Sequence, residues 1–298
     1  MLGYADPRYA ASLSEWGSPE SLAVSRGSML ARHIPGTDET DAMGCYPLFS
    51  CGNWSGLQAD FEARRASWVS ASIVTDPLGD FNELLLRSTF DLVLPFKEHF
   101  VADLSMPLEK LVSDHHRKFA RRGLRNVVVE VNNASELFLD EWDALYSHLS
   151  ERHGITGLRR FSRQSFAQQL CIAGMVVMRA RVGNETVGME LWLMQGSGVF
   201  NHLSAYDRNG YNLGAPYALH WTAYEYFRTR ARWAVLGGGA GSTGANAGLT
   251  EHKRGWASET RQVYFCGKVL QPERYVELSA RFNRTATSYF PAYRAGEF

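Results

Sequence analysis

The pattern of hydrophobic and polar positions changes along the chain, from short apolar runs in the first third to longer amphipathic stretches afterwards. Short runs bounded by turn residues are typical of strands, and apolar residues spaced three or four apart are typical of helices. In the first third, these signals predict strands at Leu22–Ser25, Ser28–Ile34, Cys45–Phe49, Trp68–Val74, Asp91–Phe96 and Glu98–Leu104.

The rest of the chain combines both patterns. Proline near the start of a stretch and glycine at its end help to delimit the helices. Helices are predicted at Pro107–Gly123, Ser135–Arg152, Ser162–Ala173, Ala215–Arg230 and Pro272–Tyr289. Strands are predicted at Val127–Val131, Met175–Val182, Thr186–Met194, Gly198–Ala205, Trp233–Leu236 and Thr260–Phe265. This order indicates an α/β class with a mixed sheet.

A cluster of glycines directly follows the predicted strand Trp233–Leu236. Glycine lets other groups approach the main chain closely, but each one costs conformational entropy when it becomes ordered. A ligand packed against bare main chain would explain the cluster, and a flexible connector is the alternative. The cationic residues that follow favour an anionic ligand or substrate near this loop. The residues concerned are Gly237, Gly238, Gly239, Gly241, His252, Lys253, Arg254 and, as a pocket wall, Trp256.

Composition and charge narrow the function classes. The chain has 298 residues, with 31 Lys plus Arg against 31 Asp plus Glu. A net charge of zero argues against capture of nucleic acid by the whole surface. One helix is an exception, because helical spacing aligns Arg117, Arg121 and Arg125, with Lys118 and Arg122 beside them. This basic stripe is either a solvated face or a contact for tRNA phosphates or another anionic carrier.

The remaining composition gives weaker signals. Four cysteines lack the spacing of a zinc site, so no metal is predicted, and unpaired thiols in a reducing compartment are expected. The first residues lack the pattern of a signal peptide, and no stretch is apolar for long enough to span a bilayer. We therefore expect a cytoplasmic protein, with a role at a membrane surface left open.

Three stretches together resemble the GNAT acyltransferase fold and, more closely, its Fem-type (FemAB-like) branch. They are the basic helix His115–Arg125, the segment Tyr206–Pro216 and the segment Gly248–Trp256. In the last of these, His252 stands where the family usually has an aromatic Phe. The resemblance covers roughly residues 105–268, with boundaries that are uncertain by about 2–4 residues.

The resemblance implies two GNAT-like units packed side by side, the first of them degenerate, with the division at residues 1–125 and 126–298. It implies direct transfer of an acyl group to an amine, with the donor inserted between two splayed parallel strands. Neutral net charge favours acyl-coenzyme A as the donor, and the basic helix favours aminoacyl-tRNA, held by Arg117, Arg121 and Arg125. The acceptor would be a small-molecule amine, an amino sugar or an envelope precursor. A non-catalytic binding module is the alternative from a different class.

The candidate residues follow from this resemblance and from local chemistry. Arg208, Gly210, Gly214 and Ala215 stand where GNAT enzymes bind the pyrophosphate of coenzyme A, although their spacing differs and a plain strand-to-helix turn is the alternative. Glu190, His202 and Tyr206 are the catalytic candidates. A carboxylate in an apolar strand such as Glu190 is costly unless it is paired, and burial raises its pKa towards that of a usable base; a salt-bridged structural residue or an edge-facing side chain is the alternative. His202 and Tyr206 could relay a proton or hold substrate, and a histidine satisfied within a half-buried sheet is the alternative for His202. The period of two places Phe200, His202, Ser204 and Tyr206 on one face of their strand. The substrate-binding candidates are Gly238, Gly239, Lys253, Arg254 and Trp256.

Overall fold

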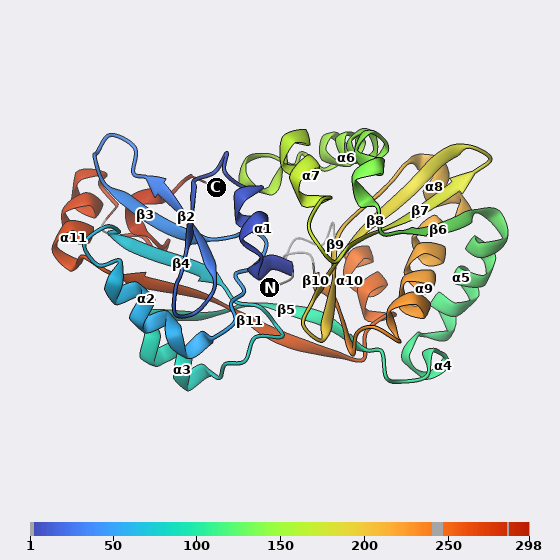
Figure 1. The fold of residues 1–298 in the computed structure, drawn as a ribbon, viewed down its shortest axis with the longest axis horizontal. Helices are drawn as coiled ribbons and strands as arrows, with labels where there is room; N and C mark the ends of the chain where they lie inside the picture. The colour runs from blue at the N-terminus through green and yellow to red at the C-terminus, as the bar shows by residue number, and fades with distance from the viewer. Residues whose placement is uncertain (1–2, 240–246, 285, 298) are drawn as a thin grey trace.

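One mixed β-sheet runs through the whole molecule. The computed structural model describes residues 3–239, 247–284 and 286–297, which form an 11-stranded sheet in the order β1-β2-β3-β4-β11-β5-β10-β9-β8-β7-β6 (Figure 1). The strands are β1 (Ser18–Ser21), β2 (Ser28–His33), β3 (Thr40–Gly44), β4 (Ser70–Val74), β5 (Leu92–Asp103), β6 (Val128–Asn132), β7 (Met175–Val182), β8 (Glu185–Gln195), β9 (Gly198–Tyr206), β10 (Trp233–Gly238) and β11 (Glu259–Val269). The predicted mixed α/β class is confirmed.

Helices cover the sheet and bury its apolar side chains. They are α1 (Pro7–Ala11), α2 (Leu57–Ala63), α3 (Glu83–Thr89), α4 (Leu108–Leu111), α5 (Asp114–Asn126), α6 (Leu139–His153), α7 (Arg163–Gln169), α8 (Arg208–Leu213), α9 (Ala215–Phe227), α10 (Ala247–Arg254) and α11 (Pro272–Arg281). In the half that contains β6 to β10, α4, α5 and α9 pack on one face of the sheet, and α1, α6 and α7 pack on the other.

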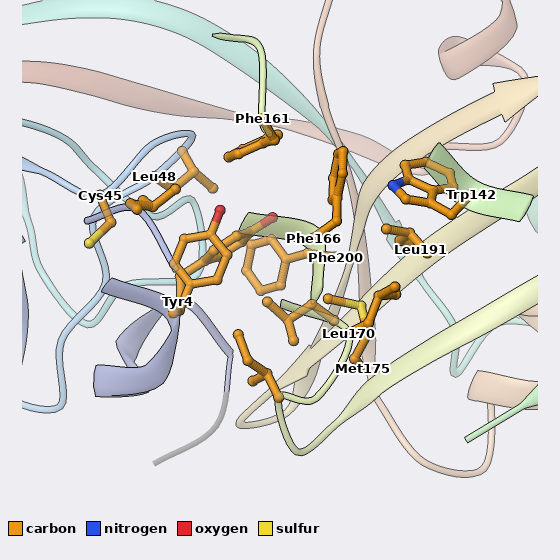
Figure 2. Close-up of a cluster of buried hydrophobic side chains, with 14 of the residues drawn as sticks. Tyr4, Cys45, Leu48, Trp142, Phe161, Phe166, Leu170, Met175, Leu191 and Phe200 are labelled. Carbon is orange, nitrogen blue, oxygen red and sulfur yellow. The ribbon is translucent and has the colours of Figure 1, made fainter. Parts of the chain in front are cut away.

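Side chains from both halves of the molecule share one core. Tyr4 from the N-terminal segment and Leu48 from the first half lie in the same buried cluster as Trp142, Phe166 and Phe200 of the second half (Figure 2). A buried polar group adds a second connection, since Asp76 Oδ2 accepts hydrogen bonds from Ser50 Oγ at 2.8 Å and Gln195 Nε2 at 2.5 Å. Desolvation raises the pKa of the Asp76 carboxyl. The two halves are therefore held by both apolar and polar contacts.

Several sequence-based elements were wrong, for identifiable reasons. The helix Pro107–Gly123 is two helices, because Val112 is extended and the Ser113 side chain caps α5 by accepting from the His116 N–H. The pair Asp91–Phe96 and Glu98–Leu104 is the single strand β5. The stretch Leu22–Ser25 is a turn that follows β1.

Two further boundaries differ from the prediction. The strand expected at Cys45–Phe49 was wrong, because β3 ends at Gly44 and only Phe49 of this stretch makes an isolated bridge. The closing helix ends at Arg281, as α11. The glycine Gly241 lies outside the described residues.

Each half contains one pair of neighbouring parallel strands. In the first half, β3 and β4 pair only at Ala42↔Ala71 and Met43↔Ser72, and an isolated bridge joins Phe49 to Thr75. Between these contacts the chain from 44 to 48 loops out, and Cys45 and Leu48 are buried in the core. The segment between the two contacts of this parallel pair thus contributes side chains to the shared core.

In the second half, β9 and β10 are parallel and part after a short contact. They pair at Trp233↔Gly198, Ala234↔Val199 and Val235↔Phe200. Beyond this point β9 continues against β8 as far as Tyr206, and β10 continues against β5 as far as Gly238. Each strand therefore keeps a ladder on its outer side while the two inner edges diverge, which is the splayed pair that the family resemblance implies.

The division at residue 125 remains a prediction. Strand β5 precedes residue 125, but in the sheet it lies between β11 and β10, which both follow residue 125. Strand β11 also pairs with β4 of the first half. The C-terminal helix α11 also packs on that half, since Leu278 contacts the cluster that contains Ile34 and Val69. The sheet is continuous across the predicted boundary.

The close approach of α5 to the start of α9 depends on a pair of glycines. A Cβ atom at Gly123 would lie 2.5 Å from the Gly214 carbonyl oxygen, which is backbone and has little room to move. Gly214 has φ +81° and ends α8 before α9 begins. Gly123 is therefore needed for the close helix contact, and Gly214 for its positive φ angle.

We predict that Gly123→Ala destabilises the protein by about 1–3 kcal/mol, because the added methyl group overpacks a helix contact. Urea unfolding measures this. The matched control is Gly248→Ala in α10, where a Cβ meets nothing within 4 Å. The control should change stability by no more than about 1 kcal/mol, in the favourable direction. Equal stability of the two variants would contradict the close packing.

Candidate active site

A cavity of about 1620 Å³ extends between the two halves and reaches the edges where β9 and β10 part. It is lined by main chain of Leu236–Gly239 on one strand and by the end of β9 on the other. Of the residues predicted from sequence, it brings together Glu190, His202, Tyr206, Gly238, Gly239, Lys253 and Trp256. It does not include Arg208, Gly210, Gly214, Ala215 or Arg254.

Glu190 is a fully buried carboxylate that accepts three hydrogen bonds. Tyr206 Oη donates to Oε1 at 2.5 Å, Trp192 Nε1 donates to Oε2 at 2.8 Å, and His220 Nδ1 lies 3.3 Å from Oε1. These three donors offset the cost of burying the charge. The structure thus brings together Glu190 and Tyr206, two residues that the sequence analysis named as separate catalytic candidates.

Sequence reasoning missed His220. It lies on α9, which was predicted as a helix without any chemical motif. No residue spacing singled it out, because its partner Glu190 is 30 residues earlier, on β8. Only the packing of α9 on the sheet brings the two side chains together.

His202 has a different environment from the one predicted. Leu191 pairs with Leu203 and Trp192 pairs with Asn201, so His202 is the extra residue of a β-bulge. The bulge reverses the alternation, which separates Phe200 from Tyr206: they belong to clusters on opposite faces of the sheet. The prediction that residues 200, 202, 204 and 206 share one face was wrong for this reason.

Both ring nitrogens of His202 have partners. Nε2 lies 3.0 Å from Gln169 Oε1, which can only accept, so Nε2 carries the proton and Nδ1 accepts from Tyr4 Oη at 3.0 Å. Burial lowers the pKa of His202 to about 3. The ring is therefore a neutral, satisfied group in the core, and a structural role fits it better than a catalytic one.

Lys253 and the glycine segment form the cationic part of the site. Lys253 Nζ donates to the Gly238 carbonyl oxygen at 2.7 Å. Lys97 and His99 of β5 flank the same glycine, where an added Cβ would lie 3.2 Å from Lys97 Cδ and 3.4 Å from His99 Cδ2. Burial and the nearby Lys97 lower the pKa of Lys253 to about 8. Arg254 points elsewhere and pairs with Glu251 on the exposed side of α10.

Aromatic side chains on α9, on α10 and just after α10 line one side of the cavity. The rings of His220 and Trp256 are 4.8 Å apart, and those of Tyr217 and His252 are 5.1 Å apart. His116 Nε2 lies 2.9 Å from the His252 carbonyl oxygen, which ties α5 to α10. Burial lowers the pKa of His252 to about 3, so that its ring is neutral. Within the described part of the chain, no group of three His, Cys, Asp or Glu side chains could hold a metal ion.

The predicted pyrophosphate loop is instead the short helix α8. The Gly210 N–H bonds Asp207 Oδ1 at 2.6 Å, and the Gly214 N–H bonds the Tyr211 carbonyl oxygen at 3.2 Å. A Cβ at Gly210 would lie 2.0 Å from the Val187 carbonyl oxygen, so this glycine allows helix-to-strand contact. Two of the backbone donors in the predicted pyrophosphate site, the N–H groups of Gly210 and Gly214, are thus used within the chain.

The basic stripe of α5 is solvent-exposed over most of its length. Arg117 bonds Asp114 and the Val112 carbonyl oxygen. In the ranges that the structure describes, no carboxylate pairs with its other cationic members, which are Lys118, Arg121, Arg122 and Arg125. No helix in these ranges is long and apolar enough to cross a membrane.

The splayed parallel pair, with helices in this order, defines the chain as a GNAT-type fold. No family model matches the sequence, and no curated protein matches it. Among solved structures, FemX has a TM-score of 0.68 at 11% identity, covering 91% of this chain and 92% of that one. The C-terminal domain of a putative lysylphosphatidylglycerol synthetase from Agrobacterium fabrum has a TM-score of 0.64 at 12% identity, covering 94% and 96%.

A third solved structure, L-PGS from Bacillus licheniformis, has a TM-score of 0.63 at 12% identity, covering 87% of this chain and 86% of that one. These similarities extend over nearly the whole of each chain. The protein therefore has the Fem-like GNAT fold, as its sequence predicted.

The buried histidines predict a pH dependence of stability. His202 has a pKa of about 3 when folded and an ordinary value of 6.5 when unfolded. Between these values the unfolded state binds one more proton, so stability falls as the pH decreases below about 6.5. Replacing His202 by Gln should reduce the proton uptake on unfolding at pH 5 by about one. Urea unfolding of both proteins between pH 5 and 7.5 measures this, and parallel pH profiles would contradict the assignment.

Proposed function

We propose that the protein transfers an acyl group directly from an activated donor to an amine, with the reacting carbonyl between β9 and β10. The observation that carries this proposal is the parting of the two strands after Val235↔Phe200, at the edge of the large cavity. Main-chain edges that no longer pair with each other can pair with a donor carbonyl. The fold shared with FemX and with the C-terminal domain of a putative lysylphosphatidylglycerol synthetase supports a transferase.

Lys253 supplies the charge that such a reaction needs. Attack of an amine on an ester or thioester creates an oxyanion, which fixed positive charge stabilises best where water is excluded. One of the three ammonium protons of Lys253 bonds Gly238, and two are left for a substrate oxygen. Gly237 and Gly238 let this oxygen approach the main chain, because neither carries a side chain.

We favour an aminoacyl ester of tRNA as the donor over acyl-coenzyme A, the donor that neutral charge suggested. The segment from Arg208 to Ala215 uses the N–H groups of Gly210 and Gly214 internally, so these donors are not free for a pyrophosphate. The exposed cations of α5 pack next to α9, beside the cavity wall formed by Tyr217. A row of like charges costs stability unless anions meet it, and a polynucleotide supplies them.

The acceptor is an amine that enters from the first half of the molecule. The cavity continues past β5 towards Tyr46 and Tyr289, so a substrate larger than a single amino acid can be held. An amino sugar or an envelope precursor fits this space. A protein that binds neither charged tRNA nor acyl-coenzyme A would instead be a non-catalytic binding module.

We predict that Lys253→Ala lowers the transfer rate roughly 100-fold or more, because the oxyanion loses its charged donor. The matched control is Arg254→Ala, the exposed neighbour, which should stay within about twofold. Transfer of labelled amino acid from charged tRNA measures both. Since the pKa of Lys253 is about 8, the wild-type rate should also fall as the pH rises above this value. Equal rates for Lys253→Ala and the wild type would contradict the role.

The α5 stripe gives a separate prediction about the donor. Replacing both Arg121 and Arg125 by Ala should weaken tRNA binding and reduce the slope of log K against log salt by roughly two, about one for each phosphate that is no longer neutralised. The control is the double variant Arg65→Ala and Arg87→Ala. Arg65 lies just after α2 and Arg87 lies on α3, and these helices are at the opposite end of the molecule from α5 (Figure 1). Fluorescence anisotropy at several salt concentrations measures the slope. An unchanged slope would mean that the stripe is a solvated helix face and does not contact tRNA.

A further inference from the structure

We infer that His220 is the general base of the transfer reaction, and that Glu190 and Tyr206 act through it as positioning residues. This inference rests on the proposed function and adds the group that removes a proton from the amine. It is carried by the geometry around the Glu190 carboxylate and by the free nitrogen of His220.

The hydrogen bonds around Glu190 fix which nitrogen of His220 carries the proton. Tyr206 and Trp192 each donate to this carboxylate, one to each oxygen. The carboxylate is therefore the acceptor of the group, and His220 Nδ1, 3.3 Å from Oε1, is the donor. With the proton on Nδ1, the Nε2 lone pair is available as a base.

The Nε2 atom is buried and has no hydrogen-bond partner among the described residues. The His220 side chain lines the cavity, and the residue is only 5% exposed. Its ring lies 6.1 Å from that of His252, whose neighbour Lys253 reaches Gly238 at the parting strands. The His220 side chain, the Lys253 side chain and the residues at the strand edges thus line the same cavity.

Three other histidines near the cavity, His202, His116 and His99, do not offer the same arrangement. Both ring nitrogens of His202 and of His116 have partners. His99 has an unpartnered Nδ1, but Lys97 and Lys253 beside it oppose a positive charge on the ring. Of these four histidines, His220 alone has a carboxylate against it that stabilises the imidazolium formed when the ring takes up a proton.

The proton balance is complete without any further reagent. The acceptor amine attacks the ester carbonyl carbon and forms the new C–N bond, and its proton passes to His220 Nε2. The tetrahedral intermediate then breaks the C–O bond to the donor. The leaving ribose oxygen takes the proton from Nε2, which restores the neutral ring.

Other titratable groups face His220 from each element packed around it, and they set the background of any pH profile. They are Glu190 on β8, Tyr206 on β9, Tyr224 on α9, His252 on α10 and His116 on α5. Burial lowers the pKa of both His116 and His252, so that these rings are neutral at neutral pH.

The test compares variants of each partner in the tRNA-dependent transfer assay. His220→Asn and His220→Gln should lower kcat by about 100- to 10,000-fold while the KM for the donor changes little. The control is His148→Asn, a histidine on α6 outside the cavity, which should match the wild type. If the wild type transfers the acyl group and both His220 variants keep its kcat, the inference is overturned. If the wild type transfers nothing from any donor, the proposed function itself is overturned.

In a plot of kcat against pH, substitutions at the two positioning residues should move the acidic limb, where the rate falls at low pH, in opposite directions. Glu190→Gln removes the negative charge that stabilises the imidazolium, so the limb should move to lower pH. Tyr206→Phe removes a donor that competes for the carboxylate, so the limb should move to higher pH. A purely structural role would lower the rate without moving the limb, and that result would contradict the inference.

A measurement on the wild type does not depend on the folding of any variant. Nitrogen-15 chemical shifts of His220 should show a protonated Nδ1 and a bare Nε2 at neutral pH. Addition of a tRNA 3′-end analogue should perturb Nε2 more than Nδ1. A proton on Nε2 instead would overturn the assignment.

Discussion

The structure depends on one constraint, the parting of two parallel strands inside a continuous sheet. Strands β9 and β10 pair at three positions and then diverge, while each remains hydrogen-bonded to a neighbour on its other side. Buried backbone groups need partners, so such an opening is stable only where a ladder on the far side holds each strand or a ligand completes the edge. The 11-stranded sheet supplies these ladders from both halves of the molecule, since β5 supports β10 and β8 supports β9.

The neighbourhood of this opening explains why the two halves are joined so firmly. Tyr4, Gln195 and Asp76 connect the N-terminal segment, the second half and the first half through partly buried hydrogen bonds, and a shared apolar core lies beside them. In the first half, Cys45 and Leu48 beside the parallel pair are buried in the shared core and also line the large cavity. Strand β11 pairs with both β4 and β5, and β5 places Lys97 and His99 beside Gly238. The first half thus contributes structure and charge to the candidate site.

Much of this could be predicted from sequence, because period and turn residues are local signals. The hairpins of β7 to β9, the helix α9 and the strand β10 with its glycines all follow from such patterns. Two kinds of feature could not be found in this way. The bulge at His202 changes the face of every later residue on its strand without any local signature. His220 gains its meaning only from a tertiary contact with a carboxylate on another element. The helix α8 was missed because Asp207 caps it within a stretch rich in turn residues.

The central claim is that the donor carbonyl lies between β9 and β10. A structure of the protein with a non-hydrolysable amide analogue of the aminoacylated tRNA 3′ end tests it most directly. The account predicts the amide carbonyl between the diverging edges after Phe200 and Val235, within hydrogen-bonding distance of Lys253 or of a strand N–H, and with the phosphates leading towards α5. An analogue that binds elsewhere and leaves these edges free would contradict the account.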